Sequence, residues 1–360
     1  MPIDIGAPYD NLPVAELKDR VLAFVTNPVE DRWDRALLGQ YVNTVSPRSV
    51  FLRNACVDAH VLDLGAGDGS LAIFKSWPFI TRPDIRMHAV SLEVGERFDL
   101  YDDYEIANFE QTSPEFGGML FDSIICTHFI EHLSNPARAL QFFGARLKPG
   151  GGVYLEWPHP VSKNMPSLKA LQECGVNVMT INFFDDGTHI EAWPMAEIAE
   201  GLQAAGLQIN TAGRVWFDFL ADQPMAHGRT DNNAADLTYA VWYKFAWAQY
   251  LIATKPYPAG AIRASAITHA RPRKLPEVRR GVGKVCRGGA SFLSRWQRPS
   301  AKAHCNVSRP MFDIGRVSSY ASTNRASLPA IFAATSDDCP SSFQTALPLT
   351  AAMQLDRIRL

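Results

Sequence analysis

Three glycines alternate with other residues in the segment Asp63-Leu64-Gly65-Ala66-Gly67-Asp68-Gly69, directly after an apolar run that predicts a buried strand. Glycine there permits positive φ and lets the backbone approach a ligand where a Cβ would collide. The dinucleotide-binding fingerprint is spaced G-x-G-x-x-G, whereas the third glycine here comes one residue early. Asp63 and Asp68 would repel a pyrophosphate and suit a ligand with an ammonium group and a sulfonium centre. The alternative interpretation is a tight turn between a strand and a helix.

Polar side chains also follow the next two predicted strands. Glu93 ends the apolar run 87–92, where a carboxylate can accept hydrogen bonds from both ribose hydroxyls of a nucleotide. Its distance along the chain from the glycine loop is somewhat longer than the ~20 residues of the dinucleotide pattern, and a solvated glutamate is the alternative. Asn108 is predicted to meet an adenine amino group, and Phe109 to offer it a ring face.

A third polar group lies at the end of the predicted strand Ser123–Thr127 and just beyond it. Its members are Thr127, His128, Glu131 and His132. Open α/β sheets bind ligands at the carboxyl ends of their strands, so these residues are expected near a crevice. Two histidines and a glutamate this close could suggest a metal site, but the HExxH spacing is absent and we expect no metal.

The elements that position these residues alternate between short apolar runs and helical stretches. Candidate strands are His60–Leu64, Met87–Leu92, Tyr104–Asn108, Ser123–Thr127, Gly152–Trp157, Leu207–Asn210 and Tyr250–Ala253, and candidate helices are Val14–Phe24, Arg32–Tyr41, Pro136–Arg146 and Met195–Ala205. This alternation is typical of βαβ units. It predicts an α/β fold with a doubly wound, mostly parallel, seven-stranded, Rossmann-like sheet.

Charge divides the chain unevenly. Residues 256–360 contain 16 Lys and Arg against 5 Asp and Glu, a net charge of +11, while the preceding residues carry −13. The basic part is rich in Arg, Ser and Pro without sustained periodicity, which predicts a disordered or loosely attached tail. The expected domains are therefore a helical segment or lid over 1–56, the α/β domain over 57–256, and the tail over 257–360.

Other global features narrow the class of protein. The six cysteines include no CxxC pair, the N-terminus lacks the pattern of a signal peptide, and no stretch reaches 18 uncharged apolar residues. We expect a cytoplasmic protein without a membrane span. The tail could be a nucleic-acid-binding arm, but its basic residues lack interleaved aromatics, so we do not expect nucleic acid as a partner. A non-native extension is a further hypothesis for it.

Taken together, residues 57–256 resemble the class I methyltransferases of the small-molecule type, which use S-adenosylmethionine. The resemblance rests on the DxGxG loop, the strand-end acid, the FDxIxxxHxxEHL run from Phe121 and LKPGG from Leu147, in that order. It also includes Asp185-Asp186-Gly187-Thr188-His189-Ile190, and Gln249–Pro256, which resembles the closing edge strand. By this resemblance the cofactor-binding residues are Asp63, Gly65, Ala66, Gly67, Glu93, Asn108, Phe109, Thr127 and His128, with Thr127 or His128 near the sulfonium.

The expected reaction is methyl transfer to a small-molecule, lipid or sugar acceptor. A hydroxyl acceptor must lose its proton, and a histidine near neutral pKa is the usual base. The candidate bases are His128, His132, His159 and His189. Two alternatives remain at this point: a non-catalytic regulatory protein that binds S-adenosylmethionine, and a nicotinamide-dependent oxidoreductase, which the glycine spacing disfavours.

Overall fold

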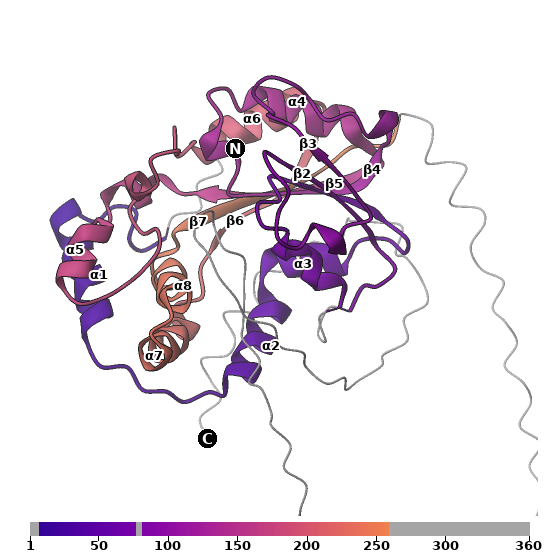
Figure 1. The fold of residues 1–360 in the computed structure, drawn as a ribbon. Coiled ribbons are helices and arrows are strands. Elements are labelled where there is room, and N and C mark those ends of the chain that lie inside the picture. Colours follow the sequence, from indigo (N-terminus) through magenta and orange to yellow (C-terminus); the bar gives the residue numbers. More distant parts are fainter. Residues whose placement is uncertain (1–6, 77–80, 259–360) are drawn as a thin grey trace, which may run out of the picture. The chain divides into compact units, whose positions relative to one another are not determined.

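A seven-stranded sheet forms the centre of the computed structural model, which describes residues 7–76 and 81–258 (Figure 1). The strands are β1 (His60–Leu64), β2 (Arg86–Ser91), β3 (Asp103–Ile106), β4 (Phe121–Thr127), β5 (Leu147–Pro158), β6 (Gln208–Val215) and β7 (Ala248–Thr254). Their order in the sheet is β3-β2-β1-β4-β5-β7-β6, and β7 runs antiparallel to the other six strands, which are parallel to one another. The predicted α/β fold is confirmed, and every predicted strand overlaps an observed one.

Strand β7 does not lie at the edge of the sheet, where the sequence resemblance predicted it. Residues 249–256 resemble a closing edge strand, but β7 lies between β5 and β6, and β6 occupies the edge. Burial gives the physical reason. Leu251 and Ala253 of β7 are fully buried, whereas β6 begins with residues that are mostly exposed or half-buried. The last strand along the described part of the chain is therefore an interior strand of the sheet.

Helices cover both faces of the sheet, as Figure 1 shows. They are α1 (Val14–Thr26), α2 (Arg35–Val45), α3 (Pro47–Arg53), α4 (Ala137–Arg146), α5 (Leu168–Glu173), α6 (Met195–Ala204), α7 (Asp222–Asp231) and α8 (Ala234–Phe245). The sequence predicted α1, α2, α4 and α6 but not the other four. A 3₁₀ helix, η1 (Ser70–Lys75), follows the glycine loop.

The side chains of each strand point alternately to the two faces of the sheet, so the strands contribute to two separate hydrophobic cores. Leu62 of β1 and Ile124 of β4 pack with α4 and α6 on one face. Val61 and Ile125, their neighbours in the chain, pack on the other face with Phe51 of α3. The sheet is consequently buried on both sides, as a parallel sheet requires.

The N-terminal helices join a third core. Leu17, Val21 and Val25 of α1 pack in one cluster with residues of α8, including Phe245. The expected helix over 32–41 begins only at Arg35, because Asp34 caps it by accepting the backbone N–H groups of Ala36 and Leu37. Helices α1 and α2 are thus part of the folded body that carries the sheet.

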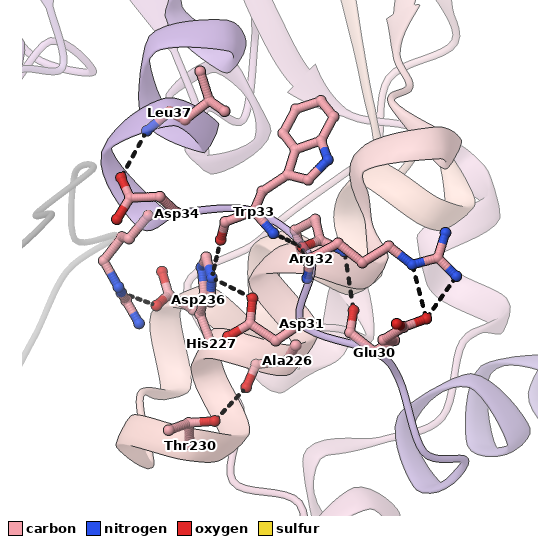
Figure 2. Close-up of polar contacts among 12 residues, drawn as sticks. Glu30, Asp31, Arg32, Trp33, Asp34, Leu37, Ala226, His227, Thr230 and Asp236 are labelled. Carbon is pink, nitrogen blue, oxygen red and sulfur yellow. Dashed lines mark hydrogen bonds and ion pairs between the residues drawn. The ribbon is translucent and has the colours of Figure 1, made fainter. Parts of the chain in front are cut away.

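Figure 2 shows how the segment before α2 is attached to α7 and α8. His227 Nε2 lies 3.1 Å from Asp31 Oδ1 and 3.0 Å from the carbonyl oxygen of Trp33. Gln223 Oε1 accepts the backbone N–H groups of Arg32 and Trp33, both at 2.9 Å. An ion pair between Arg35 and Asp236 completes the contact, at 2.5 Å.

The expected tail over 257–360 lies almost wholly outside the described residues. Within them, the longest helix, α1, has 13 residues, fewer than the ~20 that cross a hydrocarbon core. None of the helices described is both long and apolar enough to cross a membrane.

Replacing Gln223 by Ala should destabilise the protein, because two partly buried hydrogen bonds from the backbone N–H groups of Arg32 and Trp33 are lost. We expect the free energy of unfolding to fall by about 1–3 kcal/mol, measured by urea denaturation. Gln172→Ala on the exposed face of α5 is the matched control and should change it by no more than about 0.5 kcal/mol. Equal losses in the two variants would contradict the role given to Gln223.

Candidate functional site

The glycine loop leaves β1 in the left-handed region at all three glycines. Gly65, Gly67 and Gly69 have φ of +82°, +56° and +84°. The N–H groups of Gly65 and Ala66 both donate to the carbonyl oxygen of Val90, which ties the loop to the end of β2. A Cβ on Gly65 would lie 2.6 Å from the ring of Phe129, whereas a Cβ on Gly67 would meet nothing within 4 Å. The backbone is therefore open to a ligand at Gly67.

The two carboxylates beside the loop have different environments. Asp63 is buried and accepts a hydrogen bond from the hydroxyl of Tyr101. Burial raises the pKa of Asp63 to about 7, against the opposing effects of that hydrogen bond and of Arg48. Asp68 pairs with Arg97 at 2.5 Å and accepts the backbone N–H of Ser70. The expectation that both carboxylates suit a cationic ligand stays a prediction, and the charge of Asp68 is already offset by Arg97.

Glu93 lies two residues beyond the end of β2 and is exposed. Leu92 and Val94, on either side, are 69% and 58% exposed. A carboxylate between two exposed apolar side chains can bind a ligand that has both hydroxyl groups and an apolar ring.

Asn108 and Phe109 both lie beyond β3. Asn108 is exposed, and its side-chain oxygen accepts the backbone N–H of Glu110. Phe109 is buried in the core, where its ring contacts Phe129 and Phe142 edge to face. The predicted contact of these two residues with adenine stays a prediction.

His128 follows Thr127, the last residue of β4, and has a φ of +51°. Its Nε2 lies 3.2 Å from Glu156 Oε1, and its Nδ1 lies 3.5 Å from Glu131 Oε1. Burial favours the neutral ring, but the two carboxylates outweigh it and raise the pKa of His128 to about 9. A histidine that already carries its proton at neutral pH cannot accept another, so His128 is a poor candidate base.

Two charged residues of this region escaped sequence analysis. Glu156 of β5 is the register partner of Thr127 and accepts a hydrogen bond from Tyr154. Arg48 of α3 is held near it: burial lowers the pKa of the Arg48 guanidinium, but the carboxylate of Glu156 raises it further, so the net shift is upward. An acid inside an apolar strand was the only sequence signal for Glu156, and Arg48 had none.

The ring of His159 is engaged by neighbours other than the residues that follow β4. Its Nδ1 accepts the backbone N–H of Val161 and lies 3.8 Å from Asp10. Burial and the nearby Arg214 lower the pKa of His159 to about 4, against the effect of Asp10. The ring is neutral at neutral pH, but its Nδ1 lone pair is already engaged.

His189 is brought to the polar group after β4 from a remote part of the chain. One potential ligand atom from each of Glu131, His132 and His189 lies within 4.8 Å of the others. Burial lowers the pKa of His189, against the hydrogen bond from its ring to Phe183, so this ring is neutral at neutral pH. We call these three residues the EHH cluster.

The two ends of S-adenosylmethionine require different binding environments, and the residues described above offer both. Its methionine end needs open backbone and a counter-charge for its cationic groups, which Gly67 and the buried Asp63 offer. Its ribose and adenine need a carboxylate beside apolar surface, which Glu93 and its exposed neighbours offer. The residues present therefore fit this cofactor.

Alanine at Gly65 and at Gly67 should separate backbone strain from crowding. Gly67→Ala adds only the left-handed conformation, about 1–2 kcal/mol of lost stability. Gly65→Ala adds the overlap with Phe129 as well, typically a further ~1–3 kcal/mol. Thermal or urea unfolding of the two variants measures this, and an equal loss in both would contradict the close packing of Phe129 on Gly65.

Comparison with known proteins agrees with this geometry. The family model for the methyltransferase domain matches residues 31–212, about half of the chain. The ubiquinone biosynthesis O-methyltransferase of Xanthomonas euvesicatoria pv. vesicatoria (strain 85-10) is 28% identical over 212 residues, which are 56% of this chain and 83% of the relative. The protein of the same name from Xanthomonas campestris pv. campestris (strain B100) is 26% identical over 204 residues, 53% of this chain and 80% of the relative.

Solved structures of methyltransferases also align with the chain. An S-adenosylmethionine-dependent methyltransferase from Mesorhizobium loti aligns with a TM-score of 0.39 at 14% identity, covering 59% of this chain and 100% of that one. One from Archaeoglobus fulgidus aligns with a TM-score of 0.37 at 15% identity, covering 62% and 100%. It is the family model, with the sheet order and the glycine loop, that makes the assignment: the chain belongs to the methyltransferase domain family and is a class I S-adenosylmethionine-dependent methyltransferase.

Proposed function

We propose that this methyltransferase transfers the methyl group to a hydroxyl oxygen of a small molecule. The observation that carries the proposal is the EHH cluster, which lies just past the carboxyl end of β4. The two relatives described above are O-methyltransferases by name, which supports the same acceptor atom. Ubiquinone precursors with a free ring hydroxyl are accordingly the first acceptors to test.

The cofactor contacts are proposed at the residues expected from the sequence. Asp63, Gly65, Ala66 and Gly67 would hold the methionine end, and Glu93 the ribose. Asn108 and Phe109 would lie toward the adenine, and Thr127 and His128 toward the sulfonium. S-adenosylmethionine supplies an activated methyl group, so the protein's task is to orient the acceptor for in-line displacement.

Contacts along the chain link the cofactor loop to the EHH cluster. Phe129 packs on Gly65, and the neighbouring His128 contacts Glu131. A ligand over the glycine loop would therefore be separated from the cluster only by the short segment after β4. Since a hydroxyl must lose its proton during methylation, a group of basic side chains there suits an oxygen acceptor better than a carbon acceptor.

The family assignment decides between the alternatives left open by the sequence. It favours a catalytic methyltransferase over a nicotinamide-dependent oxidoreductase and over a non-catalytic binding protein. We further propose residues 57–256 as the catalytic domain, with residues 1–56 covering its cofactor side through α3 and Arg48. The role of residues 257–360 can be tested by comparing S-adenosylmethionine affinity in a chain ending at residue 256.

The affinity for S-adenosylmethionine should depend on pH through Asp63. With its pKa raised to about 7, the carboxyl is neutral below that pH and negatively charged above it. A cationic ligand prefers the charged form, so the Kd should fall several-fold between about pH 6 and about pH 8. Calorimetry on wild type and Asp63→Asn checks this, and the variant should bind weakly at every pH. A flat profile in the wild type would remove Asp63 from the cationic end of the site.

Matched acceptors should reveal the methylated atom. We expect S-adenosylhomocysteine release and a methylated product with hydroxylated aromatics, including ubiquinone precursors, and neither with the same rings carrying an amino group. Mass spectrometry of the product and coupled detection of S-adenosylhomocysteine provide the two readouts. Preferential methylation of the amines would overturn the oxygen assignment while leaving the cofactor site intact.

A further inference from the structure

The EHH cluster combines side chains from two remote segments. Glu131 and His132 belong to the 3₁₀ turn η4 (Ile130–His132), and His189 follows η6 (Phe183–Asp185). The backbone N–H of Ile190 donates to the carbonyl oxygen of Glu131 at 2.7 Å, which fixes the two segments to each other. The side chains are therefore placed by main-chain hydrogen bonding as well as by packing.

The ring of His189 has a defined tautomer. Its Nδ1 lies 2.7 Å from the carbonyl oxygen of Phe183, and a carbonyl can only accept a hydrogen bond. Nδ1 therefore carries the proton, and Nε2 keeps its lone pair. The ring also stacks on Phe183, with centroids 4.6 Å apart, which holds its plane.

His132 is fixed in the same way through Thr188. Its Nδ1 lies 2.9 Å from the Thr188 hydroxyl oxygen and 3.3 Å from the Thr188 carbonyl oxygen. The hydroxyl in turn donates to Asp186 at 2.6 Å, so it accepts from His132 Nδ1. Nε2 of His132 is left with its lone pair. Metal-binding histidines are characteristically oriented by such a hydrogen bond from their other nitrogen.

Glu131 completes the group with an unsatisfied carboxylate. Its side chain is fully buried, and neither oxygen receives a hydrogen bond from the described part of the chain. His128 Nδ1, 3.5 Å away, is an ion-pair contact only. The ion pair with His128 offsets part of its charge. A buried carboxylate whose oxygens receive no hydrogen bond is still costly, and coordination of a metal ion is one of the ways in which proteins compensate for it.

We propose that Glu131, His132 and His189 bind a divalent transition-metal ion. Two imidazoles with one carboxylate suit Zn²⁺ or Mn²⁺ and leave coordination positions open. The sequence argued against a metal because it lacks HExxH spacing, but the third ligand comes from a remote segment that no local motif includes. Asp186 Oδ2, 3.9 Å from His189 Nε2, adds negative charge on the same side.

The role of the ion rests on the proposed function, in which an acceptor hydroxyl approaches the cluster. A divalent ion there would lower the pKa of that hydroxyl, as it does for water. The hydroxyl proton leaves to solvent and the oxygen lone pair forms the new bond to the methyl carbon. The electrons of the breaking carbon–sulfur bond go to sulfur, so the sulfonium becomes the thioether of S-adenosylhomocysteine. With the ion bound, the lone pairs of His132 and His189 hold the metal, so the cluster promotes loss of the hydroxyl proton through the ion and not by accepting the proton itself.

Calorimetry on chelator-treated full-length protein tests the site directly. We expect about one equivalent of Zn²⁺ or Mn²⁺ to bind the wild type, and Mg²⁺ to bind more weakly because it prefers oxygen ligands. Glu131→Gln, His132→Gln and His189→Gln should each weaken Zn²⁺ binding by at least ~10-fold. His60→Gln is the matched control, because His60 pairs with His88 at the start of β1, and it should bind Zn²⁺ like the wild type.

Two further measurements separate the metal proposal from the proposed function. S-adenosylmethionine affinity and melting temperature should be retained in at least one cluster variant, which shows that the fold and cofactor site persist. Chelation should lower hydroxyl methylation at least ~10-fold, and Zn²⁺ or Mn²⁺ should restore it. Absence of metal binding by the wild type, or equal binding by folded cluster variants, would overturn the site. Metal binding with methylation only of amines would instead overturn the oxygen acceptor.

Discussion

The parallel pairing of β1 with β4 is the constraint on which the rest of the site depends. Leu64 lies opposite Cys126, so the two strands end side by side. The glycine loop and His128, which follow them, therefore lie together at the carboxyl ends of the strands. The chain continues outward on opposite sides of this pair, through β2 and β3 and through β5. Doubly wound folds bind ligands at such a reversal because the connections separate there and leave a crevice.

Buried ionisable groups are concentrated at the carboxyl ends of these strands. Asp63, His128, Glu131 and Glu156 come from the ends of three strands and the turn after β4, and Arg48 reaches them from α3. Burying an isolated charge costs free energy. Proteins keep buried charges where the charges neutralise one another or bind a ligand. His128 and Arg48 offset the charge of Glu156. Glu131 has the longer ion pair with His128, at 3.5 Å, and no hydrogen bond among the described residues. This difference is the reason for proposing Glu131, and not Glu156, as a metal ligand.

The N-terminal helices pack on the elements that carry the candidate site. Phe51 of α3 packs on the sheet beside Tyr154, and the segment before α2 is attached to α7 and α8 through Gln223 and His227. Sequence periodicity predicted two of the three helices here but not how they pack. The helices α7 and α8 escaped prediction, and α8 carries Trp242, whose ring contacts both His128 and Trp247. A helix that no recognisable motif marks therefore contacts a residue of the candidate site.

The sequence by itself determined the sheet, the glycine loop and the family, because these depend on local spacing: alternating apolar residues, glycines at fixed intervals and an acid at a strand end. Only the tertiary structure decided which polar residues act together. It paired Asp68 with Arg97, engaged His159 with Val161 near Asp10, placed β7 inside the sheet and brought His189 to Glu131. The reason is physical, since contacts between remote segments follow from how helices and loops pack on the sheet, and no interval along the chain encodes them.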